Sequence, residues 1–170
     1  MSEIDKFILT AILGVLAFIG KSVWEIYNEN RARKVELIEK QLSLFYYPLL
    51  IRLEKDNVTW KMILDKRKGD NSLKEKIGKN IESEVILPNH DEMIQIIEQN
   101  SYLCQDESIE KMLVQYIKHV AVYKAIRETG DENTFPMNYD KSLQWPSEFH
   151  DSISNNTKQL QRKLDKLTWK

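Results

Sequence analysis

The apolar stretch at residues 7–27, FILTAILGVLAFIGKSVWEIY, constrains the fold most, because it suits a hydrocarbon environment better than water. Its uncharged part, residues 7–20, would rise only about 21 Å as a helix, which is short of a hydrocarbon core of roughly 30 Å. Extension to Tyr27 gives about 31 Å at the cost of including Lys21 and Glu25. The stretch therefore predicts one N-terminal transmembrane helix, in a membrane domain of residues 1–30.

The residues that flank the apolar stretch predict its orientation. Trp24 and Tyr27 suit the headgroup layer, and three basic residues follow at Arg31, Arg33 and Lys34. The N-terminal side offers a single lysine beside two acidic residues, so the excess of positive charge places the C-terminal side in the cytoplasm, with the span in a bacterial inner membrane. An interfacial helix and a cleaved signal peptide are the alternatives, although the N-terminus is not clearly basic and no small-x-small cleavage site follows.

One face of this helix is small or polar. Its members follow one another at steps of three or four residues: Thr10, Gly14, Ala17, Lys21 and Glu25. Three interpretations remain open. Lys21 and Glu25 can lie at the interface with Lys21 reaching toward the headgroups, the small residues can pack helix against helix, or the whole stripe can line an aqueous pore in an oligomer.

The composition of the remaining chain predicts its fold class. Residues 31–170 suffice for one domain with its own core, and only five glycines and four prolines among 170 residues favour helix over sheet. We predict an all-α cytoplasmic bundle that drives homo-oligomerisation. Cys104 is the only cysteine, which excludes an internal disulfide and a cysteine-based zinc cluster. We predict no cofactor and no metal site.

Apolar periodicity predicts the first helices of the bundle. No breaker interrupts residues 22–45, so the membrane helix is expected to run directly into the bundle. Pro48 removes an amide donor and restricts the residue before it, which predicts a kink or a helix boundary. A second helix is expected to about Lys66, followed by a loop over residues 66–79, where glycine and turn-forming residues gather.

Capping signals predict the later helices. Asn89, with Glu92 three positions on, matches a capping box and predicts a helix start. Asp106 is the expected cap of a long helix that ends before Gly130. After an irregular stretch, a last helix is expected from about Ser147 to the C-terminus.

The predicted loop carries a surplus of four positive charges. Its basic residues form a candidate patch for phosphate backbones, including RNA, or for anionic lipid headgroups: Lys66, Arg67, Lys68, Lys74, Lys76 and Lys79. A solvated loop is the commoner outcome for such a run. The net charge of the whole chain is −1, which gives no wider electrostatic case for nucleic acid.

The sequence contains no motif for catalysis. It has no Gly-rich phosphate loop, no HExxH motif and no nucleophile elbow. A large group of helical RNases uses an arginine followed after four to six residues by a histidine, and none of His90, His119 and His150 has an arginine at those positions. His119, one turn before Tyr123, is expected to be structural or partly exposed. The chain is therefore predicted not to be an enzyme, and its aromatic residues at helical spacing are expected in the core: Tyr46, Tyr47, Trp60, Tyr116, Tyr123 and Trp145.

The order of these features resembles a known group of proteins. A single N-terminal span and a basic juxtamembrane stretch precede the segments EKQLSLFYYPLL, YIKHVAVYKAIRETGD and WPSEFHDSI. This chain is similar to small bacterial membrane proteins that accompany antiviral defence systems, nearest to the membrane accessory proteins of type VI-B CRISPR systems. The resemblance implies a divergent helical domain of the HEPN type, assembly into a ring-shaped membrane pore and an RNA-guided RNase as functional partner.

The resemblance also implies a role for the polar face of the span. Its members would face the pore lumen or the neighbouring subunit, and the missing Arg-to-His motif implies assembly rather than RNA cleavage. The expected function is an oligomeric pore that depolarises the inner membrane during antiphage defence. The alternative is a membrane-tethered adaptor, or a binding module for a ligand or RNA, that has no pore activity.

Overall fold

The computed structural model of the protein describes residues 2–61, 72–129 and 141–169; the side chains of residues 5, 6, 9–11, 72–75 and 129 lie outside this description. Within these ranges every regular element is a helix, which confirms the all-α prediction. The elements are α1 (Glu3–Lys40), η1 (Gln41–Tyr46), α2 (Tyr47–Thr59), α3 (Ser72–Ile81), η4 (Glu82–Ile86), α4 (Leu87–Asn100), η5 (Ser101–Leu103), α5 (Glu107–Thr129), η6 (Lys141–Leu143) and α6 (Phe149–Thr168).

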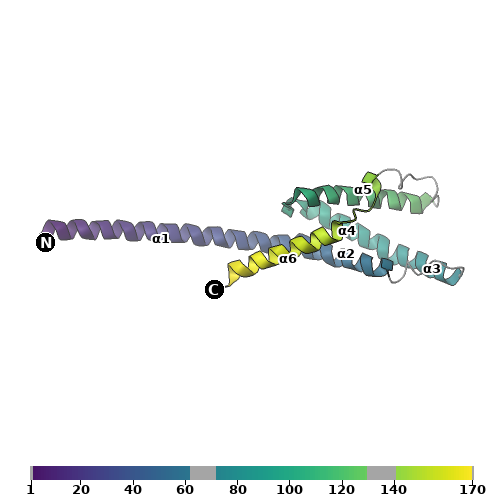
Figure 1. Ribbon diagram of the computed structural model, residues 1–170, viewed down its shortest axis with the longest axis horizontal. Coiled ribbons are helices and arrows are strands. Elements are labelled where there is room, and N and C mark those ends of the chain that lie inside the picture. The colour runs from purple at the N-terminus through teal and green to yellow at the C-terminus, as the bar shows by residue number, and fades with distance from the viewer. Residues whose placement is uncertain (1, 62–71, 130–140, 170) are drawn as a thin grey trace.

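The first helix extends far beyond the rest of the molecule. Figure 1 shows α1 leaving the bundle as one rod with the N-terminus at its far end. The predicted continuity between the apolar stretch and the bundle is therefore confirmed. Among the described residues, which omit three side chains inside the predicted span, no helix meets the length and hydropathy required to cross a membrane.

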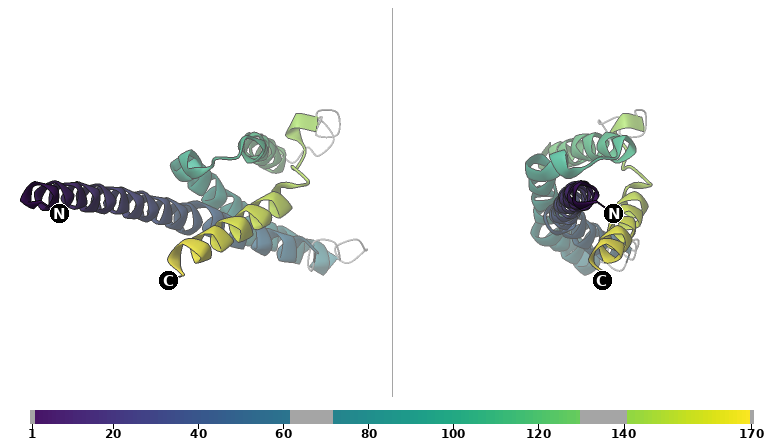
Figure 2. Two further views of the ribbon diagram at one scale, coloured as in Figure 1. Left: turned by 60° about the vertical axis from the view of Figure 1, so that its left-hand side comes forward. Right: turned by 90° about the vertical axis from the view of Figure 1, so that its left-hand side faces the viewer.

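The described helices form four rods, each a continuous run of helical segments, and successive rods run in opposite directions in the bundle. The end of α1 continues through η1 into α2; α3, η4 and α4 return beside it; α5 runs in the direction of α2, and α6 runs back across α1 and α2 (Figures 1 and 2). Their facing sides form one core with fully or almost fully buried side chains: Phe45, Tyr46, Leu49, Leu53, Met93, Ile97, Ile109, Leu113, Tyr116, Val120, Phe149 and Ile153. Of the six aromatic residues expected in the core, Tyr46 and Tyr116 are buried, whereas Tyr47 and Trp60 are exposed.

Two of the rods contain a π-helical segment just before a proline. The segment η1 ends at Tyr46, two residues before Pro48, and η4 ends at Ile86, two residues before Pro88. A proline has no amide hydrogen for the carbonyl four residues earlier, and its ring crowds that carbonyl. Local widening to the π form lets the chain pass these prolines without ending the rod. The kink or boundary predicted at Pro48 is thus a change of helix type within one rod.

Two predictions of helix limits in this part of the chain are wrong. Residues 72–79 of the predicted loop belong to α3, because the rod continues through η4 into α4. Asn89 is not an N-cap: it lies inside the rod, and its side chain is buried. The cap predicted at Asp106 is confirmed, since its Oδ1 accepts hydrogen bonds from the amides of Ser108 at 2.9 Å and Ile109 at 3.3 Å.

Candidate functional site

The three histidines of the chain, far apart in sequence, line one cavity of about 550 Å³. His90 comes from α4, His119 from α5 and His150 from α6; the remaining wall comes from α2 and the two residues after it, from η4, and from the segment before α6. The other lining residues are Leu53, Asp56, Asn57, Trp60, Lys61, Ile86, Tyr123, Trp145, Ser147 and Asp151. A cavity of this volume falls in the range of small-molecule sites.

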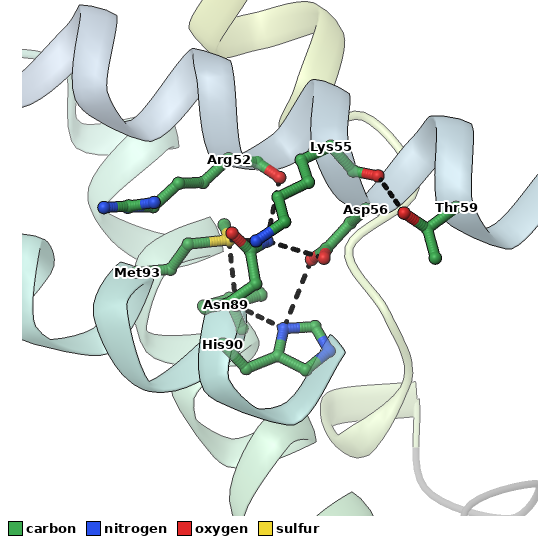
Figure 3. Close-up of polar contacts among 8 residues, drawn as sticks. Arg52, Lys55, Asp56, Thr59, Asn89, His90 and Met93 are labelled. Atoms are coloured by element: carbon green, nitrogen blue, oxygen red, sulfur yellow. Dashed lines mark hydrogen bonds and ion pairs between the residues drawn. The ribbon is translucent and has the colours of Figure 1, made fainter. Parts of the chain in front are cut away.

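Asp56 and Asn89 hold the base of the cavity (Figure 3). Asn89, on α4, donates from Nδ2 to the carbonyl of Arg52 at 3.0 Å and to Oδ1 of Asp56 at 2.6 Å, both on α2. Oδ2 of Asp56 lies 3.3 Å from Nδ1 of His90. A buried amide thus joins α2 to α4 and fixes the carboxylate beside the imidazole.

The charges at this base follow from burial. Loss of solvent raises the pKa of Asp56 to about 6 despite the Asn89 hydrogen bond, so the carboxylate is mainly ionised at pH 7. Burial lowers the pKa of His90 to about 4, with further lowering by the nearby His119 and Lys124. His90 is therefore neutral at pH 7.

The neighbours of His90 fix which of its nitrogens carries the proton. A lone pair on Nδ1 would face the ionised Asp56 carboxylate, so the proton is favoured at Nδ1. The Tyr116 hydroxyl, 2.7 Å from the same nitrogen, then accepts from it and donates to the Met93 sulfur at 3.2 Å. Nε2 keeps its lone pair and has no hydrogen-bond partner in the described part of the chain.

His119 is arranged in the same way on the opposite wall. Its Nδ1 lies 2.9 Å from the carbonyl of Leu143, which can only accept, so Nδ1 carries the proton. Burial lowers the pKa of His119, and the imidazole is neutral with a lone pair on Nε2. Its ring stacks on Tyr123 with an interplanar angle of 10° and meets Trp145 edge to face at 86°.

His150 and Tyr123 differ from these two histidines because partners within the chain occupy their polar atoms. Nε2 of His150 lies 2.8 Å from Glu54, and its Nδ1 lies 3.2 Å from Asp151. The Tyr123 hydroxyl donates to the buried Glu82 carboxylate, which also contacts Arg127 at 2.7 Å. These contacts shape the wall of the cavity.

The titratable groups of the cavity differ in how close their pKa values lie to neutral pH. A general base is most effective with a pKa near the working pH; the pKa of about 4 for His90 is well below neutrality, whereas the pKa of about 6 for Asp56 lies closer to it. Among the described side chains, no group of three or more His, Cys, Asp or Glu residues could hold a metal ion. The cavity instead presents two neutral imidazole acceptors between aromatic rings.

Four of the five residues of the polar face predicted on α1 are described by the structure. The side chains of Gly14, Ala17, Lys21 and Glu25 are exposed, and that of Thr10 lies outside the described residues. Lys21 Nζ lies 3.7 Å from Oε1 of Glu25, so the two charges offset one another along the helix.

The residues expected at the membrane interface divide into two groups. Trp24 and Tyr27 stack with ring centroids 6.1 Å apart and are exposed, as is Lys34. Arg31 donates to the carbonyl of Leu167 at the end of α6, and Arg33 pairs with Glu29 on the same helix. The first group faces outward, whereas Arg31 fastens α1 to the bundle.

Most of the candidate basic patch lies outside the described residues. This applies to Lys66, Arg67 and Lys68, and to the side chain of Lys74. Lys76 and Lys79 are exposed on α3. The anion or RNA patch stays a prediction.

Sequence reasoning missed the base of the cavity. Asp56 carries no motif, and Asn89 with Glu92 three positions on has the pattern of a capping box. The available signal was the presence of polar residues at inward positions of amphipathic helices, with His90 adjacent to Asn89.

No protein-family model, curated protein or solved structure matches the chain.

Proposed function

We propose that the protein is a bacterial inner-membrane protein anchored by α1, which assembles with copies of itself into a pore and permeabilises the membrane. The observation that carries the anchor is the uncovered apolar surface of α1. Eleven large side chains between Ile8 and Tyr27 are at least half exposed. Exposed apolar surface of this extent marks an interaction site, and hydrocarbon would cover the apolar side chains along the rod.

The pore is supported by the difference between the faces of α1. Gly14 and Ala17 leave room for a neighbouring helix, and the Lys21–Glu25 pair would be costly against acyl chains. In a ring of subunits this face meets the next helix or an aqueous lumen, which removes that cost. The proposed setting is antiphage defence beside an RNA-guided RNase.

Two glycines provide a matched test. Neither Gly14 nor Gly20 has an atom within 4 Å of the position that a Cβ would occupy, so Leu fits the single chain at both sites. Only Gly14 lies on the small and polar face. In liposomes that contain the full chain, Gly14→Leu should abolish ion leakage, whereas Gly20→Leu should preserve it.

A Lys21→Leu variant tests the polar stripe separately and should also lose leakage. Circular dichroism of each variant establishes that the bundle is folded. Unchanged leakage in both Gly14→Leu and Lys21→Leu would exclude the pore, and equal loss in the two glycine variants would remove the face-specific argument.

The cavity favours a second candidate, a membrane-tethered binding module without pore activity. Its walls come from α2, η4, α4, α5, α6 and the segment just before α6, and none of its lining residues lies on α1. A chain that begins at residue 31 should then retain ligand binding and most of the function. A pore requires α1, so loss of all cellular effect in the truncated chain favours the first candidate.

A further inference from the structure

The cavity among α2, α4, α5 and α6 has two hydrogen-bond acceptors that the fold leaves unused. His90 donates its Nδ1 proton to the Tyr116 hydroxyl beside the Asp56 carboxylate, His119 donates its Nδ1 proton to the Leu143 carbonyl, and both rings are neutral. Each Nε2 therefore retains a lone pair, and neither has a partner among the described residues. A complementary ligand must offer N–H or O–H donors.

The walls of the cavity favour a flat ligand. Trp145 lies edge to face with His119 at a centroid distance of 5.6 Å, and 6.2 Å from the ring of His90. Tyr123 is 6.2 Å from each of the same two imidazoles, and Trp60 adds an indole on the α2 side. Aromatic surface of this kind binds planar rings by stacking, a contribution that tolerates different heterocycles.

The charges around the cavity argue against an ionic ligand. The imidazoles of His90 and His119 carry no charge at neutral pH, and Lys61 is the one Lys or Arg on the described wall, so an anion is poorly matched. An organic cation would need a free carboxylate. Asp56 binds Asn89 through Oδ1, and its Oδ2 makes no hydrogen bond but is buried against Nδ1 of His90 at 3.3 Å; Asp151 contacts His150.

We propose that this cavity binds a nucleobase whose exocyclic amino group donates to the free imidazole nitrogens, with the ring between aromatic side chains. A nucleobase combines a flat ring with N–H donors in a neutral group, and the site has room for it. This binding goes beyond membrane permeabilisation and uses residues remote from α1. The base can come from a free nucleoside or nucleotide, or from single-stranded RNA.

Calorimetric titration of the full-length protein in detergent tests the proposal. The probes are adenosine, guanosine and cytidine, each beside its analogue with a dimethylated amino group, and a short mixed-sequence single-stranded oligoribonucleotide. At least one amino-bearing base should bind, and dimethylation should weaken it about tenfold, the value of one hydrogen bond. Nucleoside binding assigns the source to free nucleosides or nucleotides; binding of the oligonucleotide alone assigns it to RNA.

A histidine variant and a control variant outside the cavity locate the site. His119→Asn can still donate to the Leu143 carbonyl but lacks the Nε2 acceptor, and should weaken binding about tenfold. Asn155→Ala, an exposed change on α6 outside the cavity lining, is the control and should bind as the parent does.

Three results would overturn the nucleobase site: no binding of any probe at millimolar concentration, binding that dimethylation leaves unchanged, or binding that His119→Asn leaves unchanged. The comparison with dimethylated ligands uses the parent protein, so it tests the hydrogen bond from the amino group even if His119→Asn fails to fold. Gly14→Leu should bind nucleobases normally while losing leakage, so failure of the pore and failure of this site are separate results.

Discussion

At the scale of single residues, Asn89 is the polar side chain on which the cavity base most depends. Its Nδ2 satisfies a carbonyl and a carboxylate on the neighbouring rod, at 3.0 Å from Arg52 and 2.6 Å from Asp56. Asn89→Leu keeps a similar volume but leaves both acceptors without this donor. We expect the free energy of unfolding to fall by about 1 to 3 kcal/mol.

Urea unfolding of the detergent-solubilised protein, followed by circular dichroism, measures this loss. Asn155→Ala, an exposed change on α6, is the control and should alter stability by less than about 0.5 kcal/mol. Equal stability of the two variants would show that the Asn89 bonds do not hold α2 to α4.

Asp56 and His90 predict opposite responses to acid. The pKa of Asp56 is raised to about 6 in the fold, so the folded state gains stability relative to the unfolded state as pH falls through 6 toward 4. The pKa of His90 is lowered to about 4, so stability present above pH 6.5 is lost as pH falls toward 4. In the parent protein the two contributions largely cancel between pH 7 and pH 4.

Replacement of either Asp56 or His90 should reveal the pH-dependent stability contribution of the other residue. Asp56→Asn should lose about 2 kcal/mol more than the parent between pH 7 and pH 4, and His90→Asn should lose about 2 kcal/mol less. Urea unfolding of the three proteins at intervals of one pH unit provides the comparison. Parallel curves for both variants would show that neither group titrates abnormally.

At the scale of elements, Arg31 fastens α6 to α1. Its guanidinium donates from Nε to the Leu167 carbonyl at 2.8 Å, and Nη2 contacts the same oxygen. The cation lies at the negative end of the α6 dipole. Arg31→Ala should release the last turn of α6, and amide hydrogen exchange there should rise about tenfold.

Arg33→Ala is the matched control for this clamp. Arg33 pairs with Glu29 on the exposed surface of α1 and makes no hydrogen bond or ion pair to the described residues of α6, so the exchange rate of the last turn should not change. Hydrogen-exchange mass spectrometry on a peptide that covers residues 160–169 distinguishes the two variants. Similar exchange in both would mean that apolar packing alone holds this end of α6.

Helix content could be predicted from the sequence, whereas the continuity of the rods could not. Periodicity predicts helices over residues 107–129 and from about residue 147, and both are present. Pro88 followed by Asn89 has the local chemistry of a helix start, but η4 carries the rod past the proline. The choice depends on packing of η4 and α4 against the other rods, which local sequence does not encode.

At the scale of the whole molecule, the cavity depends on contacts between distant segments. His90, His119 and His150 lie about 30 residues apart and meet only because three successive rods reverse direction. The local sequence around each histidine is that of an ordinary helix. The three histidines therefore meet because of the topology of the bundle. No sequence motif links them, so their proximity could not be predicted from the sequence.

The N-terminal part of α1 lies outside the bundle, which predicts that this part of the chain attaches the protein to the membrane. Among the described side chains, the first buried hydrophobic residue of α1 is Ile38, so residues 1–30 contribute little to the core. A chain that begins at Arg31 keeps the clamp to Leu167 and all the core helices. It should fold to a helical protein that stays in the supernatant after centrifugation, whereas the full chain should remain in membranes washed with carbonate.

Intact mass of the membrane-bound protein completes this test, because a cleaved signal peptide would remove the apolar stretch. The full mass of the chain, retention in washed membranes and solubility of the truncated form together assign the anchor to α1. Release of the full chain by carbonate would reduce α1 to an interfacial helix, since peripheral proteins lack the hydrocarbon contacts that hold a spanning helix. Membrane retention of the truncated chain would instead move the attachment to the bundle, where the basic residues after Lys61 are the next segment to test.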